Sequence, residues 1–206
     1  MKTALLIVDI QNDFCPGGSL EVKDGDTIIQ SVNELAGSDR YDIVVATQDW
    51  HPANHGSFAS QHGAEPFSNG KLDGENQIFW PDHCIQNSEG ANFHPDLNTA
   101  PVKAIFRKGM DELVDSYSGF FDNKRKRDTG LRHYLSGLGI EEVHVCGLAA
   151  DVCVKFTASD SLDLGFKTIL IEDCTKAIND GDFEKFIELF QSKGGIVTNK
   201  KNIIGV

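Results

Sequence analysis

Short runs of aliphatic residues alternate along this chain with segments that repeat apolar residues at helical spacing. Buried strands are predicted where such a run is short and ended by polar residues, at 3–10, 42–47, 103–107, 142–147, 167–172 and 196–198. Amphipathic helices, each closed by a glycine, are predicted at 26–35, 129–138, 151–164 and 182–192. This alternation predicts an α/β fold, a three-layer, doubly wound and mostly parallel sheet of about six strands.

The stretch from residue 48 to residue 101 breaks this pattern. It is rich in His, Asn, Gly, Ser and Pro and shows no sustained period. A long irregular segment inside a compact domain is usually functional. We therefore expect one domain over residues 1–206, in which residues 48–101 form a metal-site or lid region.

Composition narrows the class of protein. Hydrophobic residues make up 40% of the 206 residues, enough for a core, which excludes disorder for most of the chain. With 19 Lys and Arg against 31 Asp and Glu, the net charge is −12, so we expect neither nucleic acid nor membrane surfaces as partners. The first apolar run ends at Asp9, too early for a membrane helix or targeting segment. Five cysteines fit reduced thiols, so we expect a cytoplasmic protein, and the sequence leaves homo-oligomer formation open.

Polar side chains follow four of the predicted strands. Asp9 follows the first strand, Asp49 and His51 follow the second, Lys108 follows the third, and the turn 147–153 follows the fourth. Ligands of an open parallel sheet bind outside the carboxyl ends of its strands. We expect these groups to meet at that edge.

The first constellation is Asp49 and His51 together with His83. One carboxylate and several imidazoles suit a divalent transition metal, with zinc, iron and manganese as candidates. Residues two apart in an extended chain face the same way, so Asp49 and His51 can share an ion. His83 would complete a three-ligand set, and His55 is either a fourth ligand or a neighbour of the set. The alternative is a polar loop whose histidines bind no metal.

The second constellation is Cys153, at the start of the predicted helix 151–164. Unpaired backbone N–H groups and the positive end of the helix dipole favour a thiolate there, and the same N–H groups can hold an oxyanion. The alternative is a buried structural cysteine, the commonest fate of a free thiol.

Asp9 and Lys108 form the third constellation. A nucleophilic thiol needs a base that takes its proton and returns it to a leaving group, and a carboxylate at the end of a central strand can do this. A neighbouring Lys would keep that carboxylate ionised. The alternative is a structural ion pair.

Six segments together resemble a known family. They are DIQNDF (9–14), DWHP (49–52), WPDHC (80–84), FRKG (106–109), YSGF (117–120) and GLAADVCV (147–154). They resemble, in this order, the motifs of nicotinamidases, which belong to the isochorismatase-like hydrolase superfamily of cysteine amidohydrolases. The likeness is nearly full length and joins metal and thiol motifs in one chain.

The resemblance implies a reaction. Cys153 would attack the carboxamide of nicotinamide, Asp9 would act as general base and then as general acid, and Lys108 would complete the triad. The backbone N–H groups of Ala149 and Cys153 would form the oxyanion hole beside a cis Leu148–Ala149 bond. Water would then hydrolyse the thioester to nicotinate, a step of NAD salvage.

The resemblance also implies how the substrate is held. One divalent metal, zinc first among the candidates, would be bound by Asp49, His51 and His83 and would take the pyridine nitrogen. The ring would lie between aromatic side chains, namely those of Phe14, Trp80 and Tyr117. Pyrazinamide would fit the same pocket. Ala150 replaces a Thr that is common in the family, and we expect activity to survive this change because the backbone donors remain.

Two other functions stay open at this point. Another amidohydrolase of the superfamily, acting on ureido or carbamoyl amides, would keep Asp9, Lys108 and Cys153 but would not need the metal ligands. A non-catalytic metal-binding or redox-sensing protein would use the cysteine without turnover. An isochorismatase proper is disfavoured, because its reaction uses no thiol.

Overall fold

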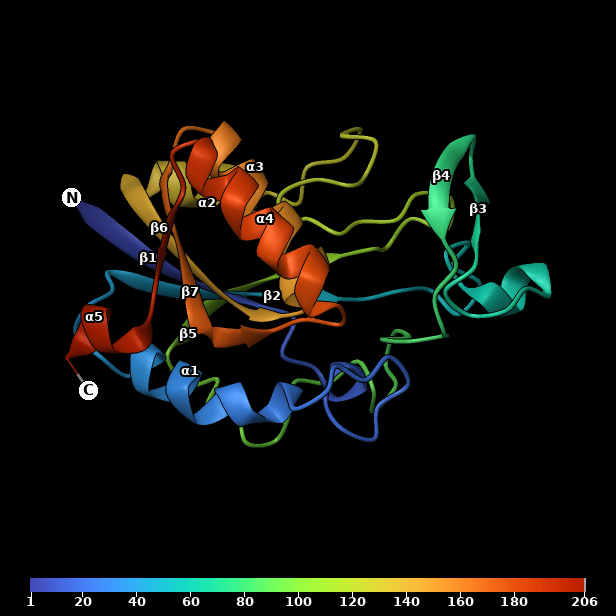
Figure 1. Ribbon diagram of the computed structural model, residues 1–206, viewed down its shortest axis with the longest axis horizontal. Coiled ribbons are helices and arrows are strands. Elements are labelled where there is room, and N and C mark those ends of the chain that lie inside the picture. The colour runs from blue at the N-terminus through green and yellow to red at the C-terminus, as the bar shows by residue number, and fades with distance from the viewer. Residues whose placement is uncertain (206) are drawn as a thin grey trace.

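A six-stranded parallel sheet forms the centre of the computed structural model, which describes residues 1–205 (Figure 1). Its order is β5-β2-β1-β6-β7-β8, and every neighbouring pair is parallel. The strands are β1 Lys2–Val8, β2 Ile43–Asp49, β5 Val102–Lys108, β6 Ile140–Leu148, β7 Lys167–Lys176 and β8 Ile196–Thr198. The helices are α1 Ile29–Ala36, α2 Leu131–Gly137, α3 Lys155–Asp163, α4 Asp180–Ser192 and α5 Lys200–Ile204. The predicted three-layer α/β class is confirmed.

Helices cover both faces of the sheet. In Figure 1, α2, α3 and α4 lie above it, and α1 and α5 lie below. Strand β1 serves both cores because its side chains alternate between the faces: Leu6 packs in the core with α2 and α4, and Leu5 and Ile7 pack in the core with α1. Among the described residues, no helix combines the length and the apolar character that a bilayer crossing demands.

The segment 48–101 is more regular than its sequence suggests. It contains a short 3₁₀ turn, Ala59–His62, and an antiparallel hairpin of β3 Asn69–Leu72 and β4 Glu75–Ile78. Asp73 and Gly74 join the hairpin strands with φ angles of 46° and 87°, the tight turn that an Asp-Gly pair favours. The expectation of no regular structure there is wrong for the hairpin, which projects beyond the carboxyl edge of the sheet (Figure 1).

Strand register brings the predicted site residues to one edge. Asp49 and Lys108 are the last residues of β2 and β5, not the residues after them, and they pair directly across the sheet. Gly147 pairs with Val8, and a Cβ at Gly147 would lie 2.0 Å from the Val8 carbonyl oxygen. Only glycine permits this approach, which sets the turn after β6 beside Asp9.

A buried carboxylate lies at the opposite, amino end of the sheet. Glu142 is 1% exposed; it accepts hydrogen bonds from His144 Nε2 at 2.9 Å and Arg40 Nη2 at 2.5 Å, and Lys167 Nζ lies 2.7 Å away. Burial alone would raise the pKa of Glu142, but these donors together hold that pKa at about 2. Burial lowers the pKa of His144, so its ring is neutral and its Nε2–H donates to the carboxylate.

This network predicts a defined loss of stability in acid. Because the folded pKa of Glu142 lies below its ordinary value of 4.5, the carboxylate stabilises the fold above about pH 4.5, and this contribution disappears as pH falls toward 2. Glu142→Gln should therefore lower the free energy of unfolding by about 2 to 3 kcal/mol at pH 7. Urea unfolding at several pH values measures this, with the exposed neighbour Glu141→Gln as control. A deficit as large at pH 3 as at pH 7 would contradict the assignment.

Candidate active site

Asp9, Lys108 and Cys153 come together at the carboxyl edge of the sheet. Lys108 Nζ lies 2.9 Å from Asp9 Oδ2 and 3.4 Å from Cys153 Sγ. The same ammonium group donates to Asp49 Oδ1 at 2.8 Å and to the Ser116 carbonyl oxygen at 3.0 Å. All three predicted residues are at most 5% exposed, so the cluster is shielded from solvent.

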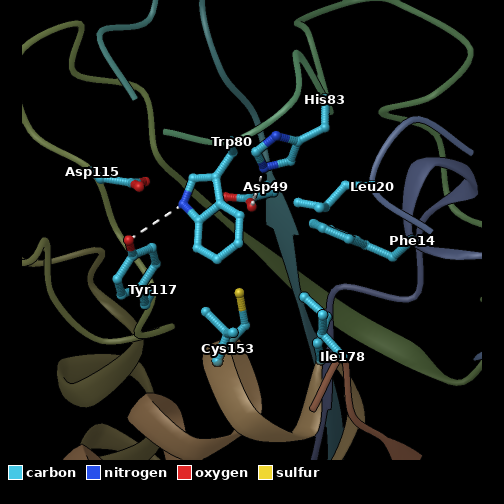
Figure 2. Close-up of a pocket in the computed structure, with 11 residues that line it drawn as sticks. Phe14, Leu20, Asp49, Trp80, His83, Asp115, Tyr117, Cys153 and Ile178 are labelled. Carbon is cyan, nitrogen blue, oxygen red and sulfur yellow. Dashed lines mark hydrogen bonds and ion pairs between the residues drawn. The ribbon is translucent and has the colours of Figure 1, made fainter. Parts of the chain in front are cut away.

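The turn that carries Cys153 differs from the predicted helix start. Residues Ala150–Val154 form one π-type turn, and α3 begins only at Lys155. The Leu148–Ala149 peptide bond is cis, as the family resemblance implied. Figure 2 shows the sulfur of Cys153 pointing into the pocket that Trp80, Asp49 and His83 also line.

Burial sets the charges in this cluster. It raises the pKa of Cys153 well above its ordinary value despite the nearby Lys108, so the expectation that the helix start favours a thiolate is wrong for this closed pocket. Burial also raises the pKa of Asp9, against the opposing effect of Lys108. Burial alone would lower the pKa of Lys108, but Asp49 and Asp9 raise it, so the amine stays protonated. The thiol therefore needs a proton acceptor. Asp9 lies within reach, because its carboxylate and the Cys153 sulfur come within 4.8 Å of each other.

Thr47 positions the Asp9 carboxylate, a contact that the sequence pattern did not predict. Its hydroxyl donates to Asp9 Oδ1 at 2.7 Å, and both side chains are fully buried. The available signal was a hydroxyl residue among aliphatic residues of a buried strand. With Oδ1 held by Thr47 and Oδ2 held by Lys108 Nζ at 2.9 Å, the carboxylate has one fixed orientation beside the thiol.

Thr47→Val should weaken catalysis more than folding. The change preserves shape but removes the only side-chain donor to Asp9 Oδ1, at a cost of about 1 to 3 kcal/mol for the unpaired oxygen. We expect kcat/KM to fall about tenfold, since the base loses its orientation. Thr168→Val is the matched control, because Thr168 is 1% exposed and its hydroxyl bonds Ser161 and Phe166, away from Asp9. Equal losses of activity in the two variants would refute the role given to Thr47.

The predicted metal ligands Asp49, His51 and His83 also converge. Their ligand atoms lie within 4.8 Å of one another, and Asp49 Oδ2 lies 3.4 Å from His51 Nε2 and 3.7 Å from His83 Nε2. Each ring points its Nε2 inward because its Nδ1 bonds a carbonyl oxygen, that of Gly109 at 2.8 Å or of Pro81 at 2.7 Å. One carboxylate and two imidazoles oriented this way fit a divalent transition metal.

Two further residues support this cluster, and neither was predicted as a site residue. The Gln11 amide bonds both the backbone N–H and the carbonyl oxygen of Asp49, each at 2.8 Å. Gly109, with φ of 68°, lies against His51, where a Cβ would be 2.3 Å from the imidazole. Gln11 belongs to the DIQNDF segment, so its place in that motif was its only sequence signal.

His55 lies beside the ligand set, and its ring is tilted by 46° to the ring of His51 with the centroids 4.3 Å apart. Its Nδ1 lies 2.7 Å from the Ser57 hydroxyl and 3.2 Å from the Ser57 backbone nitrogen. Burial lowers the pKa of His55 to about 4, so the ring is neutral. His51, His55 and Asp115 lie close enough to share an ion, and His55 Nε2 is buried without a hydrogen-bond partner among residues 1–205. These contacts fit His55 either as a fourth ligand or as a neighbour of the set.

One pocket is lined by Cys153 and by two of the metal ligands, Asp49 and His83. Its lining includes the three predicted aromatic residues Phe14, Trp80 and Tyr117 (Figure 2). The lining also includes residues that the sequence analysis did not select, namely Leu20, Asp115, Ala149, Val152 and Ile178. A flat heterocycle in this space would have aromatic walls and would lie beside both the thiol and the two ligands Asp49 and His83.

A parallel sheet with thiol, carboxylate and ammonium groups at its carboxyl edge defines an α/β hydrolytic enzyme. The chain belongs to the isochorismatase family, whose isochorismatase domain matches residues 3–202. It is 54% identical over 178 residues to a nicotinamidase of Escherichia coli, covering 85% of this chain and 84% of the relative.

Solved structures agree with this family assignment. A nicotinamidase and pyrazinamidase of Acinetobacter baumannii superposes with a TM-score of 0.93 at 46% identity, covering 98% of this chain and 97% of the other. The pyrazinamidase of Pyrococcus horikoshii, solved in complex with zinc, superposes with a TM-score of 0.78 at 36% identity, covering 97% and 99%.

Proposed function

We propose that the chain is a nicotinamidase, an amidohydrolase that converts nicotinamide and water to nicotinate and ammonia. The observation that carries this proposal is one aromatic pocket lined by Cys153, Asp49 and His83. Asp9 and Lys108 lie behind the thiol, and His51 completes the metal-ligand cluster. Similarity to the nicotinamidases of Escherichia coli and Acinetobacter baumannii supports it.

The reaction begins at the sulfur of Cys153. Asp9 takes the thiol proton as the sulfur forms a bond to the carboxamide carbon, and the backbone N–H groups of Ala149 and Cys153 hold the resulting oxyanion. Asp9 then gives the proton to the amide nitrogen, the C–N bond breaks and ammonia leaves, with a thioester on Cys153. Water attacks the thioester, Asp9 takes a proton from this water, and the C–S bond breaks to release nicotinate and regenerate the thiol. Lys108 stays protonated throughout and stabilises the Asp9 carboxylate.

Asp49, His51 and His83 would hold one divalent transition metal. Zinc is the first candidate, because a related pyrazinamidase was solved with zinc. When bound, the metal supplies a ligand position for the ring nitrogen and withdraws electron density from the ring. Phe14, Trp80 and Tyr117 enclose the ring and exclude water from the carboxamide.

The same pocket should accept pyrazinamide, because a diazine ring has the same shape and keeps the required nitrogen. We place the product nicotinate in NAD salvage. An amidohydrolase for ureido or carbamoyl amides has no use for a metal beside the thiol, so the three-ligand cluster argues against that alternative.

Ammonia release tests this proposal directly. Purified protein loaded with zinc, iron or manganese should release one ammonia per nicotinate formed, and a chelator should stop the reaction until metal is restored. The Cys153→Ala variant, loaded with metal in the same way, measures the background release of ammonia. If the metal-loaded protein releases no more ammonia than this variant, the proposed function is wrong.

A further inference from the structure

The hairpin β3–β4 reaches the pocket through one buried side chain. Gln77, on β4, is 5% exposed although its hairpin neighbours Asn76 and Ile78 are exposed. An amide buried at the base of a projecting hairpin needs polar partners, and its partners here belong to the pocket lining.

The amide nitrogen of Gln77 contacts three acceptors. It lies 2.8 Å from the Ile78 carbonyl oxygen, 2.8 Å from Asp115 Oδ2 and 3.0 Å from the Tyr117 hydroxyl. The carbonyl and the carboxylate can only accept, which fixes the orientation of the amide group. Its two N–H hydrogens serve three acceptors, so one of them is shared between two acceptor oxygens. Asp115 and Tyr117 line the pocket, so Gln77 bonds two residues of the pocket lining.

The Tyr117 hydroxyl also connects Gln77 to the indole of Trp80. Trp80 Nε1 donates to the Tyr117 hydroxyl at 3.3 Å, and the two rings meet edge to face with centroids 6.1 Å apart (Figure 2). The same hydroxyl oxygen therefore accepts from Gln77 and from Trp80. Trp80 is only three residues after Gln77, so this link closes the base of the hairpin onto the loop that carries Tyr117.

The tip of the hairpin is held as well. Lys124 Nζ bonds both the carbonyl oxygen and the side chain of Asp73 at the hairpin turn. The side chain of Asp73 is about half exposed, so the ion pair at the tip contributes little to stability. The buried bonds of Gln77 at the base are the stronger restraint on Trp80.

We infer that Gln77 is a positioning residue that sets substrate affinity, because it fixes Tyr117 and, through Tyr117, the indole wall of the pocket. This inference rests on the proposed function for its substrate. A wall that is ordered before binding lowers the entropy cost of association. Loss of the link should therefore weaken binding of the ground state and of the transition state alike.

Two substitutions break the link from opposite sides. Gln77→Met keeps the chain length but removes the donors, and Tyr117→Phe removes only the shared hydroxyl. Each removes the Gln77–Tyr117 hydrogen bond and should raise KM for nicotinamide about fivefold, with kcat within about twofold of wild type. The double variant should show a KM no higher than the larger single effect, because both changes break one link. Gln61→Leu, at an exposed glutamine of the 3₁₀ turn, should change neither constant.

A fluorescence measurement tests the positioning without substrate. Trp50 and Trp80 are the two tryptophans of the chain, so Trp50→Phe leaves Trp80 as the single indole probe. In that background, Gln77→Met and Tyr117→Phe should each increase acrylamide quenching about twofold, and Gln61→Leu should not. Failure of the wild type to release ammonia would overturn the proposed function but would leave this measurement intact.

The inference is overturned by any of three results: KM increases that multiply in the double variant, a fall of kcat at constant KM in Gln77→Met, or unchanged Trp80 quenching. If Gln77→Met does not fold, Tyr117→Phe decides alone, since it leaves the bonds of Gln77 to Ile78 and Asp115 in place.

Discussion

Cys153→Ala should abolish nicotinamide turnover while the protein stays folded. Loss of a catalytic nucleophile that acts together with its base lowers kcat by about 10⁴-fold or more. The substitution removes one buried sulfur atom, so the free energy of unfolding should change by only about 1 kcal/mol. Ammonia release measures turnover, and mass spectrometry after rapid quenching should find a nicotinoyl adduct on the wild type and none on the variant.

The matched control is Cys146→Ala. Cys146 is a fully buried free thiol within β6, whose sulfur lies 3.9 Å from the Leu6 carbonyl oxygen, away from the pocket. The Cys146→Ala variant should keep turnover within about twofold of wild type, because a substitution away from the active site changes stability and not the reaction. An adduct on a cysteine other than Cys153, or substantial turnover by Cys153→Ala, would disprove the nucleophile assignment.

A nicotinamide-bound form of Cys153→Ala should also exist. The aromatic walls and the metal ligands lie outside the substituted side chain, so the interactions that hold the ring remain. Titration of the metal-loaded variant with nicotinamide should therefore show saturable binding. Absence of binding would mean that Cys153 contributes to the pocket and not only to the chemistry.

The sheet and most of the site were predictable from sequence for one physical reason. Strands buried on both faces are continuous aliphatic runs, and the residues at their carboxyl ends meet in space when the sheet is parallel. Asp9, Asp49 and Lys108 could thus be grouped before any coordinates were known. The family resemblance then supplied their proposed roles, which the hydrophobic pattern could not.

The hairpin and its Gln77 contact were not predictable in the same way. The residues of β3 and β4 are mostly polar, with Leu72 and Ile78 as the apolar exceptions, so they show no alternating apolar face. The Asp-Gly turn at 73–74 was the only local signal. The raised pKa of Cys153 was not predicted for a related reason. Its cause is burial by residues from distant segments of the chain, and the electrostatics of the helix end does not include this burial.

His83→Ala should cause the protein to lose its bound metal. His83 and His51 are the two imidazoles that point Nε2 toward Asp49 Oδ2, and each is oriented by a carbonyl oxygen behind it. Removing one of three protein ligands should weaken metal affinity by more than about 100-fold, beyond the 10- to 100-fold typical of changes to an orienting partner. Elemental analysis after dialysis against metal-buffered solutions measures the affinity without any assay of turnover.

Two histidine controls separate ligation from general effects of substitution. His133→Ala, at a side chain that is 76% exposed, should retain full metal content. His55→Ala should weaken metal affinity by less than His83→Ala, because the cluster that contains Asp49 is formed with His51 and His83, whereas His55 groups with His51 and Asp115. Full metal occupancy in His83→Ala would remove His83 from the ligand set. A loss in His55→Ala as large as in His83→Ala would instead show that His55 is a fourth ligand.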